Sequence, residues 1–223
     1  MEDQRIAGSE LIMAVLVVDE QKKPIHGPYV VRLGGWSLER YLKEAPEHLI
    51  WEFVRGEVVM HSPATAEHER LINFLVRLLG GYCEAKGWGE VLTGPAAIRI
   101  LPDVIREPDI FVLSPEEVPK AKGMPLQARP ALIIEVISSP TRTIDLREKT
   151  ADYASAGIPE YWAVDPEAKE ITVHELKRGS YKVERISSGR VESRSVPGFW
   201  LEVDWLFQEP LPLAGGCLQQ ILR

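Results

Sequence analysis

Short apolar runs alternate with a helical segment between residues 107 and 165, and this is the clearest pattern in the chain. The run 131–138 holds only apolar or small side chains apart from Glu135, which predicts a buried strand. Alternation along a strand places Ile133, Glu135 and Ile137 on one face. An ionised carboxylate in a buried strand is costly unless it is paired or bound to a metal. Glu135 is therefore expected to point into a site.

A helix is predicted to follow this strand, from about residue 143 to Gly157, because glycine is a common C-terminal cap. Lys149 and Tyr153 lie one turn apart on one helical face, which places Lys149 on the side that packs against the sheet. An alternative is that Lys149 pairs with Asp145 on a solvated face, an interaction worth only a few tenths of a kcal/mol. For a lysine considered alone, the solvated pair is the better interpretation.

A second acidic residue changes that balance. Asp109 opens the apolar run IFVL, and a linker over residues 124–130 separates this predicted strand from the one that carries Glu135. Carboxylates that converge on one point suit a hard divalent cation, and a lysine beside them suits a phosphate or an attacking water. The combination of Asp109, Glu135 and Lys149 therefore predicts a site rather than a surface ion pair.

Proline-aspartate at the start of one strand, a second acidic strand and a nearby lysine resemble the PD-(D/E)XK, or restriction-endonuclease-like, nuclease superfamily. More narrowly, the chain resembles the Uma-type restriction endonuclease family of bacteria over about residues 36–207, through the strings WEFVRGEVVMHSPATAEHERL, PDIFVL and ALIIEVISSPTRTIDLREKTADYASAGIPEYWAVDPEAKEITVHEL. One departure is that the superfamily's lysine two residues after the glutamate is Ile137 here. The Uma-type family assigns that role to a lysine on the following helix, which corresponds to Lys149.

The resemblance implies an α/β fold of restriction-endonuclease-like type, with a mixed central β-sheet flanked by helices, over residues 36–207. Residues 1–35 are predicted to add an N-terminal extension, in which the apolar run 11–18 and the strand 29–33 form an extra β-hairpin. Such a hairpin would cover a sheet edge or join subunits, so a homo-oligomer is a possible assembly. Residues 208–223 are predicted to form a C-terminal tail with a short helix.

The implied function is hydrolysis of phosphodiester bonds in DNA, with magnesium or manganese as the cofactor. Asp109 and Glu135 would hold the metal ion, and the backbone carbonyl of Val136 would complete the protein ligands. Lys149 would position or help to deprotonate the attacking water and would neutralise the charge that builds on the phosphorus.

The resemblance also points to Glu57 and His68, while Arg142 and Arg147 are candidates because they lie in the loop and helix beside the acidic strands. Glu57 matches an acidic position of the family, and His68 matches a histidine, so both are candidate catalytic groups in an outer shell or at a second metal. The alternatives are an exposed hairpin glutamate for Glu57 and a capping or packed histidine for His68. Arg142 and Arg147 are candidates for binding the substrate backbone, and surface charge is the alternative for both.

The rest of the chain is predicted to surround this centre. Ser37 opens a short helix, residues 51–61 form a hairpin, and the longest helix runs over 64–86. Gly80 and Gly81 lie inside that helix, where glycine lowers helix stability and marks a kink or a close crossing.

Composition limits the function classes. The 223 residues carry a formal net charge of −7, which argues against non-specific coating of nucleic acid, so any DNA contact must be local. Cys83 and Cys217 lack the spacing of a zinc site or disulfide framework, and a reducing cytoplasm is the expected location. Acidic residues near the start argue against a signal peptide, and the apolar run 11–18 is shorter than the roughly 20 residues of a membrane span.

Two other function classes stay open at this point. The fold could persist as a catalytically silent interaction module or oligomeric scaffold, which the acidic charge and the absence of lysine at Ile137 favour. A hydrolase of a different phosphate ester is the third possibility. Convergence of Asp109, Glu135 and Lys149 in an open cleft would separate the enzyme from the scaffold.

Overall fold

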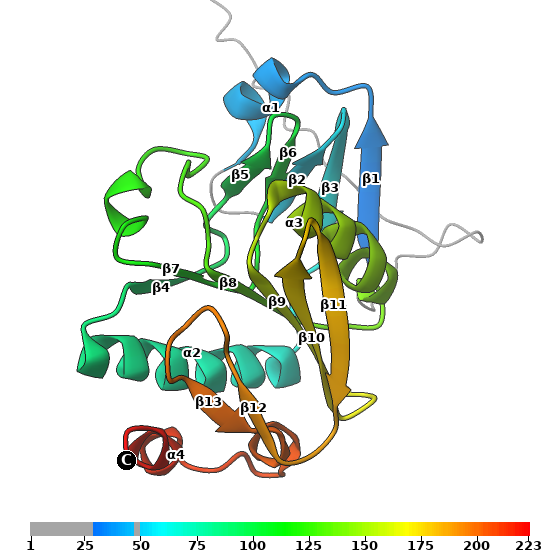
Figure 1. Ribbon diagram of the computed structural model, residues 1–223. Coiled ribbons are helices and arrows are strands. Elements are labelled where there is room, and N and C mark those ends of the chain that lie inside the picture. The colour runs from blue at the N-terminus through cyan, green and yellow to red at the C-terminus, as the bar shows by residue number, and fades with distance from the viewer. Residues whose placement is uncertain (1–28, 47–49) are drawn as a thin grey trace, which may run out of the picture.

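The computed structural model describes residues 29–46 and 50–223, and its central layer is a mixed β-sheet (Figure 1). Its strands, in spatial order, are β11 (Ser180–Ile186), β10 (Glu170–Lys177), β9 (Glu160–Asp165), β8 (Leu132–Val136), β7 (Ile110–Leu113) and β4 (Glu90–Thr93). Strands β8 and β9 are parallel, while the other neighbours in this sheet are antiparallel. The predicted α/β fold with a mixed central sheet is thus confirmed.

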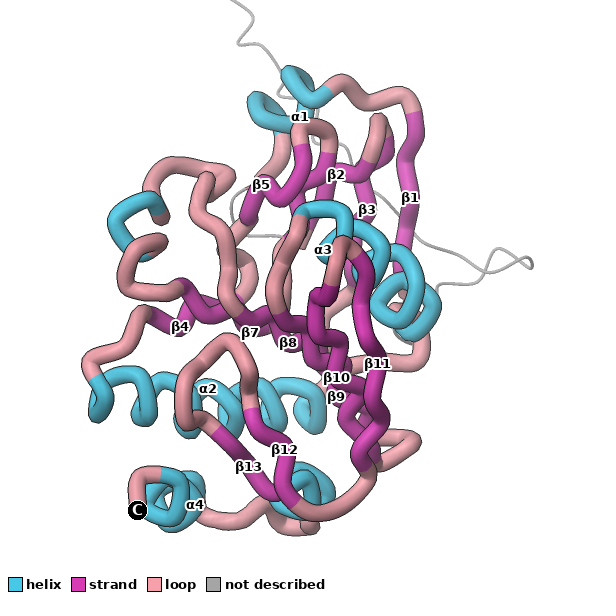
Figure 2. Tube along the Cα trace, viewed as in Figure 1, coloured by secondary structure: helices cyan, strands magenta, loops and turns pink. Residues whose placement is uncertain are grey.

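A second, antiparallel sheet packs beside the first, and the sequence patterns did not predict it as a separate layer (Figure 2). Its strands, in spatial order, are β1 (Val30–Gly34), β3 (Glu57–His61), β2 (Trp51–Val54), β6 (Val104–Arg106) and β5 (Ile98–Leu101). The strand predicted over 29–33 is β1, and it pairs with β3. Its predicted partner, the run 11–18, lies outside the described residues.

Helices cover both faces of the mixed sheet (Figure 1). On one face lies α2 (Ala66–Lys86), with α4 (Ala214–Ile221), β12 (Arg190–Glu192), β13 (Trp200–Glu202) and the 3₁₀ turn η3 (Val203–Phe207) beyond it. On the other face lie the π-helical turn η2 (Ile144–Lys149) and α3 (Thr150–Ala156), close to the second sheet. The remaining short elements are α1 (Leu38–Glu44), which Ser37 caps as predicted, and the 3₁₀ turn η1 (Val118–Lys120).

The alternation predicted along β8 is confirmed and explains how Glu135 is aimed. Leu132 and Ile134 belong to the core formed with α2, whereas Ile133 and Ile137 belong to the core on the α3 side. Because side chains alternate along a strand, Glu135 shares the face of Ile133 and points toward η2 and α3.

The segment after β8 differs from the single α-helix predicted over 143–157. It begins as a π-helical turn, and only Thr150–Ala156 is α-helical. The carbonyl of Asp145 accepts hydrogen bonds from the hydroxyls of Thr150 and Tyr161, each at 3.1 Å, so side chains satisfy a backbone group in the widened turn. Gly157 ends α3 in the left-handed conformation, with φ of 70°, as its capping role predicts.

The two glycines predicted to mark a kink or a crossing in α2 have different surroundings. A Cβ on Gly81 would clash with the side chain of Leu218 in α4, whereas a Cβ on Gly80 would meet nothing within 4 Å. Gly81 therefore permits the close approach of α4. None of the helices in the described ranges combines the length and apolar character needed to cross a membrane.

Candidate active site

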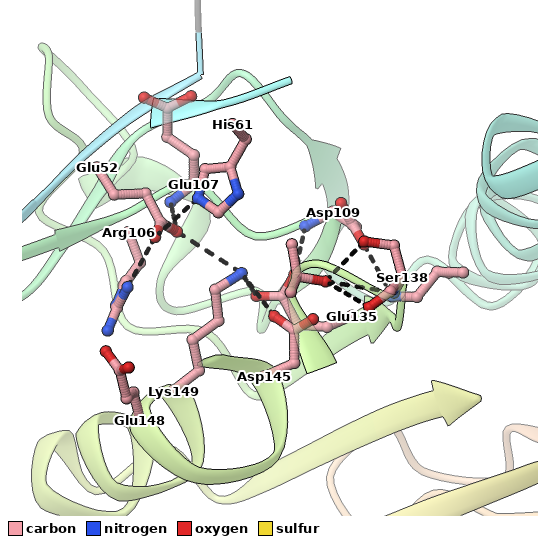
Figure 3. A network of polar contacts seen from close by, with 12 residues as sticks. Glu52, His61, Arg106, Glu107, Asp109, Glu135, Ser138, Asp145, Glu148 and Lys149 are labelled. Atoms are coloured by element: carbon pink, nitrogen blue, oxygen red, sulfur yellow. Dashed lines mark hydrogen bonds and ion pairs between the residues drawn. The ribbon is translucent and has the colours of Figure 1, made fainter. Parts of the chain in front are cut away.

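Five of the eight predicted site residues meet where the end of β8, the start of β7, the first turn of α2 and the π turn η2 approach the second sheet (Figure 3). A cleft of about 80 Å³ opens between these elements. Its lining includes Asp109, Glu135, Val136, His68 and Lys149. Side chains that lie far apart in the sequence are therefore brought to one cavity.

Asp109 and Glu135 lie side by side at the ends of β7 and β8. The carboxylate of Asp109 accepts a hydrogen bond from the backbone N–H of Val136 at 2.8 Å. The backbone N–H of Asp109 approaches Glu135 Oε2 at 3.4 Å. These contacts fix both carboxylates relative to the two strands.

His68 joins this group from the first turn of α2. Its Nε2 donates to the carbonyl oxygen of Val136 at 2.9 Å and lies 3.3 Å from Asp109 Oδ2. Burial lowers the pKa of His68, but the carboxylate of Asp109 and the Val136 carbonyl outweigh burial, so the net pKa is raised. His68 thus contacts two of the oxygens that were predicted to hold a metal, which is more than a capping role requires.

Lys149 is buried among acidic side chains rather than exposed on the helix. Its Nζ lies 2.9 Å from Glu135 Oε1, 3.2 Å from Asp145 Oδ1 and 3.6 Å from Glu52 Oε1, and its side chain is 5% exposed. Burial disfavours the ammonium, but these carboxylates raise the pKa of Lys149 well above its ordinary value. The alternative of a solvated Asp145–Lys149 pair is therefore wrong, because Asp145 is buried as well.

Glu135 is held by hydrogen bonds as well as by charge. Tyr153, on α3, donates its hydroxyl to Glu135 Oε1 at 2.7 Å. Burial is the main cause that raises the pKa of Glu135 to about 8; Lys149 acts in the opposite direction, and Asp109 adds to the increase. With a pKa of about 8, Glu135 is protonated for most of the time at neutral pH, while Lys149 remains charged.

The sequence interpretation missed Glu52, on β2, which reaches the cluster from the second sheet. Its side chain is fully buried, and Oε2 accepts from Arg106 at 2.7 Å. Burial would raise the pKa of Glu52, but Lys149 and Arg106 hold it well below its usual range. The signal was available, since Glu52 interrupts the apolar strand WEFV just as Glu135 interrupts its own strand.

The structure does not bring Glu57, Arg142 or Arg147 into the cluster. Glu57 is half exposed, and its carboxylate lies 3.3 Å from Arg32. Both terminal nitrogens of Arg142 face Asp165, and one of them also faces Glu167. Arg147 is exposed on the π turn. Their predicted catalytic and substrate-binding roles stay predictions that these contacts do not support.

Charge and ligand chemistry both fit a divalent cation. In the described part of the chain, the carboxyl groups in and beside the cleft outnumber the cations: the carboxyl groups are those of Glu52, Glu107, Asp109, Glu135 and Asp145, and the cations are Lys149 and Arg106. One oxygen of Glu107 is buried without a partner among the described residues, and burial, reinforced by Glu52, raises the pKa of Glu107 to about 8. A bound dication would favour the ionised form of these crowded carboxyl groups.

The protein offers a small set of oxygen ligands for such an ion. Within residues 29–46 and 50–223, no three acidic, histidine or cysteine side chains form a ready metal-binding group. Asp109, Glu135 and Val136 line the cleft together, and their carboxylate and backbone carbonyl oxygens are the candidate ligands. Magnesium commonly uses one or two carboxylates and keeps several waters, so this set suits it.

Comparison with known proteins agrees with the fold and with the motifs. The fold is similar to a solved structure titled as a "putative nuclease belonging to DUF820" from Anabaena variabilis ATCC 29413, with a TM-score of 0.66 and 16% identity over 77% of this chain and 97% of that one. No curated protein matches the chain. A family model, Uma2, described as "Putative restriction endonuclease", matches residues 38–204. Because this match covers most of the sequence, the chain belongs to the Uma2 family.

Proposed function

We propose that the protein is a nuclease that hydrolyses phosphodiester bonds in DNA with the help of magnesium or manganese. The observation that carries this proposal is the convergence of Asp109, Glu135 and Lys149 from separate elements on one cleft. Membership of the Uma2 family supports the same reaction class. The convergence also favours an enzyme over a catalytically silent scaffold, since a scaffold has no need of a buried, acid-rich cleft.

The carboxylates of Asp109 and Glu135 and the carbonyl of Val136 would hold the cation. When bound, the cation would supply Lewis-acid stabilisation of the phosphoryl group. The protein's own contribution is a fixed arrangement of oxygens, because Asp109 is held by the N–H of Val136 and Glu135 by the hydroxyl of Tyr153. Such fixed groups need little rearrangement during the reaction, which is how enzymes gain from electrostatics.

Lys149 is proposed to stabilise negative charge on the phosphoryl oxygens. Its raised pKa keeps the ammonium protonated at working pH, which favours charge stabilisation over removal of a proton from water. The carboxylates that surround it hold the ammonium at the cleft and prevent it from extending into solvent. His68, which contacts Asp109 and the Val136 carbonyl, is proposed to orient these two oxygens.

Cleavage of labelled duplex, single-stranded and supercoiled DNA by the purified protein tests the proposal. The wild type should cleave at least one of these substrates in millimolar Mg²⁺ or Mn²⁺ and should stop when a chelator is added. Asp109→Asn should lose the activity. The matched control is Asp103→Asn, which makes the same chemical change at an exposed residue of the turn between β5 and β6.

The control decides whether the activity belongs to this cleft. Asp103→Asn should cleave at the wild-type rate. Cleavage that survives in Asp109→Asn would place the activity elsewhere or in a contaminant. If the wild type leaves every form of DNA intact in both metals, the proposed function is wrong.

A further inference from the structure

We propose that Glu52 is a positioning residue for the site: from the second sheet, it holds the Lys149 ammonium at the cleft while Glu135 serves the cation. This inference rests on the proposed function for its catalytic consequence. The contact that it concerns, between Glu52 and Lys149, is present whatever reaction the cleft performs.

The two oxygens of Glu52 have separate partners (Figure 3). Oε1 lies 3.6 Å from Lys149 Nζ and accepts from the backbone N–H of Glu107 at 3.2 Å. Oε2 accepts from Arg106 at 2.7 Å and lies 3.4 Å from Nε2 of His61. Because both oxygens are fixed, the carboxylate cannot rotate away from Lys149 without breaking a buried hydrogen bond.

The other acidic partners of Lys149 cannot by themselves hold its ammonium at the cleft. Glu135 makes the shortest contact, but it is also a proposed cation ligand, so a bound cation would share its charge. Asp145 lies one turn away on the same helical segment and moves together with Lys149. Glu52 belongs to β2 and therefore fixes the ammonium relative to a different layer of the fold.

Glu52 is also part of a network of ion pairs that extends from the cleft toward the surface. Arg106 is fully buried. It also donates hydrogen bonds from Nε and Nη2 to Asp152 Oδ2, at 3.2 and 2.5 Å. Asp152, on α3, is buried and is bridged in turn by Arg55, which is half exposed. Charges therefore alternate from the surface to the cleft, from Arg55 to Lys149, and the burial of Glu52 is offset by Arg106.

The same network suggests a purely structural role, in which Glu52 only joins the two sheets. The two roles differ in one respect. A structural role predicts equal consequences from loss of charge at Glu52 and at Asp152, since both are buried partners of Arg106. A positioning role predicts a specific loss of rate at Glu52, because Asp152 makes no contact with Lys149 among the interactions of the described residues.

The experiment compares Glu52→Gln with Asp152→Asn in single-turnover cleavage, in Mn²⁺ calorimetry and in urea unfolding. Glu52→Gln should lower kcat by about 10–100-fold, the usual effect of removing a group that orients a functional side chain. Its KM and Mn²⁺ affinity should stay near the wild-type values. Asp152→Asn should lose similar stability yet keep the wild-type kcat. Equal losses of kcat in the two variants, or no loss in Glu52→Gln, would overturn the proposal.

A second variant covers the case in which Glu52→Gln does not fold. Glu52→Asp keeps a negative charge that can balance Arg106 but withdraws the carboxylate by one methylene from both Arg106 and Lys149. It should therefore fold and still show the lowered kcat. A wild-type kcat in folded Glu52→Asp would contradict the positioning role.

A readout independent of cleavage separates this inference from the proposed function. In protein labelled with ¹⁵N-lysine, the Lys149 ammonium is identified by its absence from Lys149→Met. With Mg²⁺ present, its protons should exchange with water faster in Glu52→Gln than in the wild type and Asp152→Asn. Faster exchange in Glu52→Gln without any DNA cleavage by the wild type would refute the proposed nuclease function and support the positioning role of Glu52. DNA cleavage by the wild type with unchanged exchange in Glu52→Gln would support the nuclease function and refute the positioning role.

Discussion

Replacing Lys149 with methionine should destabilise the metal-free protein strongly and in a pH-dependent way. Methionine keeps most of the side-chain volume but leaves Glu135, Asp145 and Glu52 without the cation that they share. Removing one partner from a buried ion pair costs about 3–5 kcal/mol, whereas a solvated surface pair costs less than about 0.5 kcal/mol. Because Lys149 is buried, the larger cost is expected for Lys149→Met.

The size of the effect should grow with pH. The pKa of Glu135 is already raised to about 8, mainly by burial, and loss of Lys149 would raise it further because Lys149 lowers it in the wild type. A carboxyl group whose pKa is higher in the folded protein contributes stability below its unfolded pKa and loses it as pH rises through the folded pKa. The variant should therefore lie closest to the wild type near pH 5 and furthest from it near pH 9.

Urea unfolding in chelator, monitored by circular dichroism at several pH values, measures this difference. At about 2–4 °C per kcal/mol for a chain of this size, the thermal midpoint should also fall by about 6–20 °C at high pH. The matched control is Lys43→Met, since Lys43 lies exposed in the last turn of α1. A deficit below about 0.5 kcal/mol that does not vary with pH would refute the buried-cation argument.

Three further predictions concern metal binding, the buried Glu107 and the two glycines of α2. In calorimetry, Mn²⁺ should bind weakly to the wild type and not measurably to Asp109→Asn, and Zn²⁺ should show no advantage, because the ligands are hard oxygens. Burial, followed by the charge of Glu52, raises the pKa of Glu107 to about 8. Its stabilising contribution is thus complete below pH of about 4.5 and lost toward pH 8. Glu107→Gln should therefore be similar to the wild type in stability at pH 4.5 and more stable by about 4 kcal/mol at pH 8, as urea unfolding would show. Gly80→Ala should raise stability by about 1 kcal/mol through helix propensity, and Gly81→Ala should raise it less because the Leu218 side chain of α4 must shift. Equal gains would contradict the close crossing.

Local patterns predicted the centre of the site because they act over a few residues. The two-residue repeat along β8 was sufficient to turn Glu135 inward, and the helical spacing placed Lys149 on the buried side. The π turn was not predictable in this way. It depends on hydroxyl groups, including that of Tyr161 from the next strand, that satisfy a backbone carbonyl of the turn.

Contacts between distant segments explain the side-chain positions that the sequence did not predict. Glu57 is drawn to Arg32 because β1 pairs with β3, a pairing that the hairpin sequence alone does not specify. Arg142 pairs with Asp165 at the end of β9, in the adjacent parallel strand. Glu52 enters the site only because a second sheet packs beside the first, and no periodicity in the sequence predicts that arrangement.

We propose that the cleft hydrolyses phosphodiesters with a cation held by Asp109 and Glu135 and with charge stabilisation by Lys149. The single-turnover cleavage rate of Lys149→Met at saturating Mn²⁺, at a pH where the variant is folded, tests it most directly. Loss of one group that stabilises the transition state should lower the rate by about 10²–10³-fold while Mn²⁺ affinity remains near the wild-type value. A folded Lys149→Met protein that cleaves DNA as fast as the wild type would contradict the proposed role of Lys149 and of the cleft.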